Sequence, residues 1–167
     1  MIGKQSRHLA LLIFAASLIL QGCGFQLRGS TNLPSSIGPV FIQGVGEHEE
    51  LGRELTHMIA YSDIQVVKNP DTASSILKIS QRTSDRRVIS VDGNGNVAEY
   101  ELHEGASFSL IGAGGHELVK EQPVTITTTY LNSETEVLGK QQEEGTLRRD
   151  MQRDLAAQIM RRLQAQL

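Results

Sequence analysis

The stretch VAEYELHEGASFSLI, residues 97–111, decides the fold of this 167-residue chain. Its apolar side chains share one parity over most of that length: Ala98, Tyr100, Leu102, Ala106, Phe108 and Leu110. Successive side chains of a β-strand point to opposite faces, so the alternation predicts a long strand with one apolar face. A sheet that buries one of its faces follows from this pattern.

Two further runs with β character flank this strand, Ile76 to Val91 before it and Val124 to Tyr130 after it. The links are Asp-Gly-Asn-Gly-Asn at residues 92–96 and Gly-Ala-Gly-Gly at residues 112–115. Both are rich in residues that tolerate a positive φ, as tight turns require. We therefore expect two consecutive hairpins, which form an antiparallel meander.

Two segments have helical periodicity. From Glu49 to Tyr61 the apolar residues are spaced for one helical face: Leu51, Leu55, Met58 and Ile59. The last segment begins with a capping box at Ser133 and Glu136 and then repeats an apolar residue at every fourth position: Leu147, Met151, Leu155, Ile159 and Leu163. Five arginines off that stripe are predicted to form a solvated face: Arg148, Arg149, Arg153, Arg161 and Arg162.

The order of elements predicts the fold class. Val40 to Ile42 is a short apolar run with β-branched character and is the expected first strand, whereas Ile64 to Val67 fits either a strand or an extended turn. The resulting order is β-α-β-β-β-α. It predicts an α+β fold with a mostly antiparallel four-stranded sheet and two helices packed on one face.

The N-terminus has the order of a signal peptide. Basic Lys4 and Arg7 precede an apolar run from Leu9 to Leu20, which is shorter than the roughly 20 residues of a spanning helix. Leu20-Gln21-Gly22-Cys23 follows and resembles the bacterial lipobox, in which the cysteine thiol is acylated and the chain is then cleaved just before that cysteine. Residues 1–22 are thus predicted to be a signal peptide and Cys23 the lipidation site.

Cys23 is the only cysteine of the chain, which excludes an intramolecular disulfide. The alternative interpretation of this residue is a buried or stray thiol. Residues 23–39 are rich in Gly, Ser, Pro and Asn and are expected to form a lipidated tether to a single domain at 40–167. Gly24 stands where an Asp would favour inner-membrane retention, so by resemblance to sorted lipoproteins we expect the outer membrane.

Composition and motifs argue against several classes of function. The chain has 16 Lys and Arg residues and 19 Asp and Glu residues, a net charge of −3, and loses Lys4 and Arg7 with the signal peptide. This charge disfavours nucleic-acid binding. The histidines form no spaced metal pair, and neither a nucleophile elbow nor a phosphate loop is present. We expect no catalytic residues, no metal site and no cofactor.

Several short motifs, in their order and spacing, resemble the LptE family of lipopolysaccharide-assembly lipoproteins. They are Cys23-Gly24-Phe25-Gln26-Leu27-Arg28-Gly29, Asn94-Gly95, Ala98-Glu99-Tyr100, Leu138-Gly139-Lys140, Met151, Ala156-Ala157-Gln158 and Arg161-Arg162-Leu163. The resemblance covers essentially the whole mature chain. It implies a non-enzymatic protein that plugs the outer-membrane β-barrel LptD, binds lipopolysaccharide and helps deliver it to the cell surface.

The resemblance also implies candidate lipopolysaccharide-binding residues. Lys140 matches a family lysine at the start of the last helix. A basic residue of the family's hairpin loop falls at about Gly93 here, and Arg86 and Arg87 are the nearest candidates to replace it. Lipid A carries phosphates on an acylated sugar, so a binder needs cations beside apolar surface, and Arg86-Arg87-Val88-Ile89 supplies both.

Alternatives remain from the residues alone. Arg86 and Arg87 also fit a solvated charge pair, and Lys140 fits an ordinary surface lysine. The whole chain also fits a free-standing, periplasm-facing lipoprotein that binds another ligand or hydrolyses envelope material, or a structural lipoprotein with another envelope partner. Co-purification with a large outer-membrane barrel separates these functions.

Overall fold

The computed structural model describes residues 32–132 and 137–167, and in the last segment the side chains from residue 142 onward. Cys23, the expected signal peptide and the expected capping box at Ser133 and Glu136 lie outside these residues. Within them, no helix is both long and apolar enough to span a membrane. The elements are η1 (Ser35–Ile37), β1 (Val40–Gln43), α2 (Glu50–Ala60), β2 (Val66–Val67), η2 (Pro70–Thr72), β3 (Ser75–Val91), β4 (Val97–Gly112), β5 (Glu117–Leu131) and α3 (Val137–Gln164).

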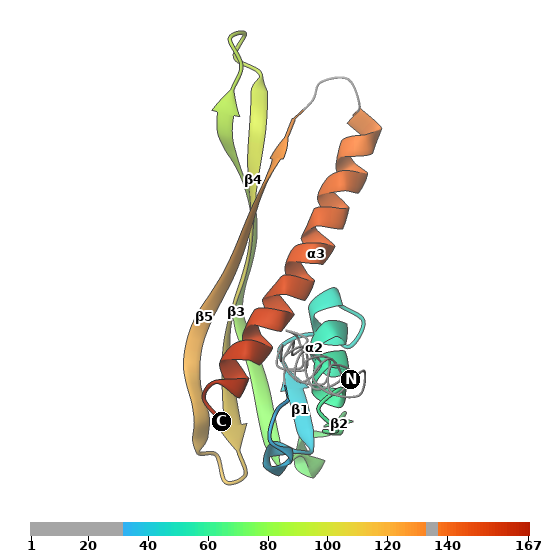
Figure 1. The fold of residues 1–167 in the computed structure, drawn as a ribbon, viewed down its shortest axis with the longest axis vertical. Coiled ribbons are helices and arrows are strands. Elements are labelled where there is room, and N and C mark those ends of the chain that lie inside the picture. The colour runs from blue at the N-terminus through green and yellow to red at the C-terminus, as the bar shows by residue number, and fades with distance from the viewer. Residues whose placement is uncertain (1–31, 133–136) are drawn as a thin grey trace, which may run out of the picture. The chain divides into compact units, whose positions relative to one another are not determined.

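The five strands form one sheet in the order β2-β1-β3-β4-β5 (Figure 1). β1 is parallel to both β2 and β3, whereas β3, β4 and β5 form the antiparallel meander. The predicted α+β class is confirmed, and the sheet has one strand more than expected. That strand, β2, has only two residues. It can pair with β1 because the chain turns after α2 and returns beside β1.

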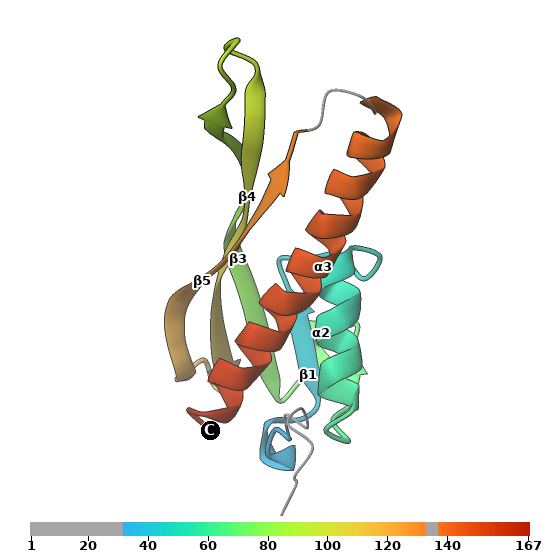
Figure 2. The same cartoon turned by 45° about the horizontal axis from the view of Figure 1, so that its top comes forward.

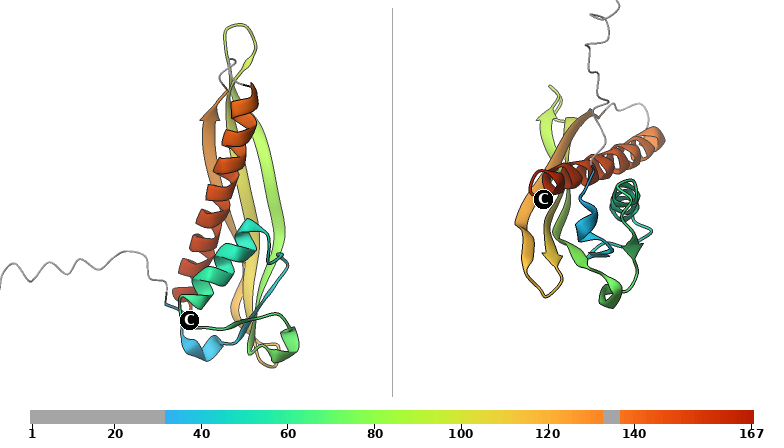
Figure 3. Two further views of the ribbon diagram at one scale, coloured as in Figure 1. Left: turned by 90° about the vertical axis from the view of Figure 1, so that its right-hand side faces the viewer. Right: turned by 60° about the horizontal axis from the view of Figure 1, so that its bottom comes forward.

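Both helices lie on the same side of the sheet, as predicted (Figure 3). α2 buries Leu51, Leu55 and Ile59, which are spaced one turn apart. The four-residue stripe of α3 enters the same core through Leu155, Ile159 and Leu163. Apolar burial of this kind is the main stabilising term of a small domain.

The three long strands continue beyond the core. β1 pairs with β3 only at Ser75–Lys78, so the remainder of β3 has no neighbour on that side within the described sheet. We call the three-stranded portion the arm: residues 82–91 of β3, 97–104 of β4 and 126–131 of β5. α3 runs diagonally along the sheet, and its N-terminal half lies beside the arm (Figures 1 and 2).

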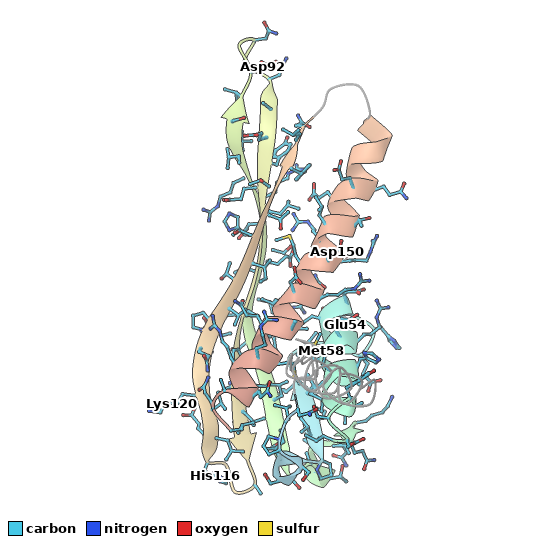
Figure 4. All side chains as sticks on the ribbon, viewed as in Figure 1. Glu54, Met58, Asp92, His116, Lys120 and Asp150 are labelled. Atoms are coloured by element: carbon cyan, nitrogen blue, oxygen red, sulfur yellow. The ribbon has the colours of Figure 1, made fainter. Side chains whose placement is uncertain are left out.

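Glycine and aspartate residues shape the two hairpin loops, as expected. Gly95, Gly114 and Gly115 have φ values of +87°, +84° and +82°, which glycine adopts without strain. At the arm tip, the Asp92 carboxylate accepts hydrogen bonds from the backbone N–H groups of Asn94 and Asn96 at 2.9 and 2.8 Å. Asp92 and His116 mark opposite ends of the sheet (Figure 4).

A β-bulge in β3 decides which side chains of the arm face the helices. The pairing with β4 steps from Ser80↔Ser107 to Thr83↔Gly105, which inserts one extra residue in β3, and Gln81 has a φ of +49°. An extra residue shifts the side-chain parity. Leu77 and Ile79 face the core before the bulge, whereas Ser84 and Arg86 face the helix side after it.

The packed part of the chain begins before residue 40. Leu33 and Ile37 are buried in the core, and the Ser75 hydroxyl donates a hydrogen bond to the Ile37 carbonyl at 2.6 Å. The end of the segment expected to be a tether is therefore packed onto the domain. The Gly-, Ser- and Pro-rich composition of this segment predicted a tether, although two of its apolar residues pack into the core.

Candidate functional site

The structure separates the two arginines that the sequence placed together. Arg86 lies opposite Leu102 on β4, and Arg87 lies opposite Glu101. Because neighbouring residues of a strand point to opposite faces, Arg86 faces α3 and Arg87 faces away from it. The two guanidinium groups therefore cannot hold one phosphate jointly from these positions.

Arg86 is bound to two partners on the helix-facing side. Its Nη1 lies 2.8 Å from Oε2 of Glu144, which belongs to α3. Its guanidinium carbon lies 4.5 Å from the centre of the Tyr100 ring, a cation–π contact. Tyr100 in turn stacks on Tyr130 of β5 with the ring centres 5.5 Å apart.

Glu144 also collects donors from Tyr130 and Arg148. The Tyr130 hydroxyl donates to Oε2 of Glu144 at 2.9 Å. Nε of Arg148 donates to Oε1 of Glu144 at 2.9 Å, and its Nη2 lies 2.8 Å from the same oxygen. One carboxylate thus joins α3 to β3 and β5.

Arg148 makes a second set of bonds to the sheet. Its Nη1 lies 2.7 Å from Oε1 of Glu104 and 2.8 Å from the Ser84 hydroxyl oxygen. Ser84 donates to the same Glu104 oxygen at 2.6 Å. Glu104 is only 4% exposed, and the positive charge of Arg148 offsets the free-energy cost of burying its carboxylate. We call the whole set the Glu144 cluster: Ser84, Arg86, Tyr100, Glu104, Tyr130, Glu144 and Arg148.

The charges of the cluster shift the pKa values of its members. Burial acts to raise the pKa of Glu144, but hydrogen bonds from Tyr130, Arg148 and Arg86 outweigh it, so this pKa is lowered. The pKa of Tyr130 is raised by burial and by its bond to Glu144. Burial acts to lower the pKa of Arg148, yet Glu104 and Glu144 raise it. Glu144 is therefore an anion at neutral pH.

Apolar contacts next to the Glu144 cluster also join α3 to the arm. Leu102, Tyr130 and Met151 form a buried cluster of their own, and Tyr100, Ile126 and Leu147 pack against it. The N-terminal half of α3 is therefore held to the arm by a small apolar patch together with the Glu144 cluster.

The prediction of a solvated arginine face on α3 is wrong for Arg148 and Arg162. The side chain of Arg148 is 23% exposed and ion-paired twice, and Arg162 donates to the Pro123 carbonyl on the edge of β5 at 2.7 Å. Arg153 is half exposed and lies between Asp150 and α2, where Glu50 is 3.1 Å away. The spacing of four residues between Glu144 and Arg148 was the sequence signal that could have indicated their ion pair.

The opposite face of the arm has different chemistry. Arg87 lies opposite Glu101, whose carboxylate contacts His103 Nε2 at 2.5 Å, and His103 lies opposite Asp85. Among the described residues, Arg87 has no ion pair of its own. No group of three or more metal-ligating residues occurs in the described part of the chain either.

Large apolar side chains are exposed at the far end of the arm. Val88, Ile89, Val91 and Leu131 are between 46% and 69% exposed. Exposed apolar side chains gathered in one region commonly mark a surface that meets a partner or a lipid. Lys140 lies in the first turns of α3, one turn before Glu144, and its side chain falls outside the described part of the chain.

Comparison with known proteins identifies the family. The family model for LptE, described as lipopolysaccharide-assembly, matches residues 37–163. The chain belongs to the LptE family. The match runs from the last residue of η1 to the end of the buried stripe of α3, and so includes most of the core and the whole Glu144 cluster.

Named relatives share sequence over nearly the whole chain. The LPS-assembly lipoprotein LptE of Yersinia enterocolitica is 29% identical over 95% of this chain and 76% of its own length. The protein of the same name from Pectobacterium atrosepticum is 26% identical over 95% of this chain and 86% of its own length.

Solved structures share the LptE fold seen here. The solution structure of lipoprotein B from Nitrosomonas europaea has a TM-score of 0.67 at 27% identity, covering 85% of this chain and 91% of that one. Rare lipoprotein B from Shewanella oneidensis has a TM-score of 0.65 at 22% identity, covering 75% and 93%. The latter supports the fold alone.

Proposed function

We propose that this LptE-family chain is an outer-membrane lipoprotein, anchored through Cys23, that plugs and helps assemble the LptD β-barrel and binds lipopolysaccharide for delivery to the cell surface. The observation that carries the proposal is the family match over residues 37–163. The lipobox-like Leu20-Gln21-Gly22-Cys23 supports the lipid anchor, which would hold the chain on the periplasmic side of the membrane with its domain in the barrel lumen.

The arm supports a role in contact with a partner. It extends beyond the core as three strands, and its tip exposes Val88, Ile89, Val91 and Leu131 to solvent in the isolated chain. A barrel lumen or a lipid chain would remove this apolar surface from water, which stabilises the assembly.

The proposed lipopolysaccharide contacts are Arg86, Arg87 and Lys140. Arg87 is the available guanidinium on the outer face of the arm, whereas Arg86 is bound to Glu144. A phosphate bound by either arginine would gain charge-assisted hydrogen bonds, which are stronger than neutral ones. The two arginines must contact different phosphates or act in different steps, because they lie on opposite faces.

The test measures lipopolysaccharide capture and LptD co-purification in one preparation. The triple variant Arg86→Glu, Arg87→Glu, Lys140→Glu should lose capture by more than the roughly 1.5–3 kcal/mol of one well-formed charged bond. The charge-matched control is Lys78→Glu, Lys120→Glu, Arg161→Glu. It changes three exposed residues outside the arm and should retain lipopolysaccharide capture. Circular dichroism confirms that each variant is folded.

The outcomes separate the two parts of the function. If the folded triple variant captures as much lipid as the parent, the basic-site assignment is wrong, and retained LptD association in that variant leaves the plug role standing. A parent protein that purifies without LptD refutes the plug role and favours a free-standing envelope lipoprotein.

A further inference from the structure

The carboxylate of Glu144 occupies a site that is built for an anion. Four donor groups from three residues converge on its two oxygens: Nη1 of Arg86 at 2.8 Å, the Tyr130 hydroxyl at 2.9 Å, and Nε and Nη2 of Arg148 at 2.9 and 2.8 Å. Two guanidinium groups and a hydroxyl are also the donors with which proteins bind phosphate.

The charge balance shows what removal of Glu144 would do. Arg86 and Arg148 are balanced by Glu104 and Glu144, so the cluster is neutral as it stands. Withdrawal of the Glu144 carboxylate would leave one net positive charge among the same donors. That charge would attract an anion, which could then bind the donors that the Glu144 carboxylate had occupied.

The remaining donors would stay in place without Glu144. Arg148 is still held by Glu104 and by the Ser84 hydroxyl, at 2.7 and 2.8 Å. Arg86 still lies over the Tyr100 ring. These contacts of Arg148 and Arg86 do not depend on Glu144, so an incoming anion would find both guanidinium groups already oriented.

Solvent reaches the site. The Glu144 side chain is 20% exposed and that of Arg86 is 47% exposed. Rotation of the partly exposed Glu144 side chain toward water would release its four bonds. A phosphate oxygen can accept the bonds that Glu144 releases.

We propose that Arg86, Tyr130 and Arg148 form a phosphate-binding site that Glu144 fills as an intramolecular occupant, and that a phosphate group binds there by displacing the Glu144 carboxylate. The lipid source of that phosphate rests on the function proposed above, whereas the site itself does not. Glu144 lies one helical turn after Lys140, so a phosphate at this site would be bound close to the start of α3.

The test compares Glu144→Ala with Glu143→Ala in the full-length lipoprotein in detergent. Glu143 is exposed on the same turn of α3 and has no ion pair among the described residues, so its replacement changes the same charge outside the site. The probes are inorganic phosphate, followed by ³¹P NMR titration, and purified lipopolysaccharide, followed by capture on the immobilised protein.

Glu144→Ala should bind inorganic phosphate more tightly than Glu143→Ala, on the order of tenfold, because one competing charge has left the site. Adding Arg148→Ala or Tyr130→Phe should cancel the gain. Equal phosphate binding by the two single variants overturns the proposal. Glu144→Gln, which preserves the side-chain size, provides the same comparison if Glu144→Ala does not fold.

The lipopolysaccharide capture measurement distinguishes the source of the phosphate. A parallel gain in lipopolysaccharide capture supports a lipid phosphate as the ligand. A gain for inorganic phosphate without one for lipopolysaccharide overturns the lipid source and supports the site. Lipopolysaccharide capture by the parent with no effect of Glu144→Ala on either probe overturns the site and leaves the proposed function standing.

Discussion

Replacement of Arg148 by Met should destabilise the domain, because it leaves a buried carboxylate without its charge partner. Glu104 is 4% exposed, and its bonds come from Arg148 and from Ser84. Breaking a buried ion pair from one side costs about 3–5 kcal/mol. Arg148 itself is 23% exposed and Ser84 remains, so we expect a smaller loss, about 2–3 kcal/mol.

The loss should be visible in thermal unfolding and should be recovered by a second change. For a domain of this size it corresponds to a decrease in Tm of about 10 °C by circular dichroism. Glu104→Met combined with Arg148→Met removes both charges, so much of the stability should return, with a coupling free energy of about 1.5 kcal/mol. Arg161→Met is the control, because Arg161 is exposed on α3. A Tm for Arg148→Met equal to that of the control would refute the structural role of this arginine.

Three further changes test the anchor, the core and the charge of Glu144. Cys23→Ala should block lipidation and signal cleavage, and radiolabelled fatty acid on the variant would contradict this. Leu155→Asp should cost about 3–5 kcal/mol, because Leu155 is 2% exposed; an unchanged Tm would show that the α3 stripe is not core. Glu144 has a lowered folded-state pKa, so its stabilising effect should be present above the ordinary glutamate pKa and lost as pH falls through the folded-state value. Unfolding free energies of the parent and Glu144→Gln should therefore differ more at pH 7 than at pH 3, and a pH-independent difference would be inconsistent with this.

Elements with a local sequence signal could be predicted before the structure was known. The alternation from Val97 to Ile111 corresponds to β4, the glycine-rich links correspond to the two hairpin loops, and the four-residue spacing in α3 corresponds to the buried stripe. Each of these depends on a backbone period or a turn conformation. Such features are readable from neighbouring residues because the side chains that repeat also share a face.

Elements without a repeated pattern were decided by their partners. β2 has two residues and exists because it pairs with β1 at Val40↔Val66. β5 begins at Glu117, earlier than the alternation from Val124 suggested, and it includes Pro123. A proline lacks the N–H of a ladder bond and is tolerated on an edge strand, which β5 is.

The candidate site depended on strand register, which no single segment encodes. The bulge at Gln81 turns Arg86 toward α3 and Arg87 away from it. Pairing of β4 with β5 brings Tyr100 against Tyr130, and the packing of α3 brings Glu144 and Arg148 to both. A shift of one residue in any of these registers would exchange the two faces. The residue types of the cluster were visible in the sequence, but which charges meet depends on the pairing of the strands and the packing of α3 against them.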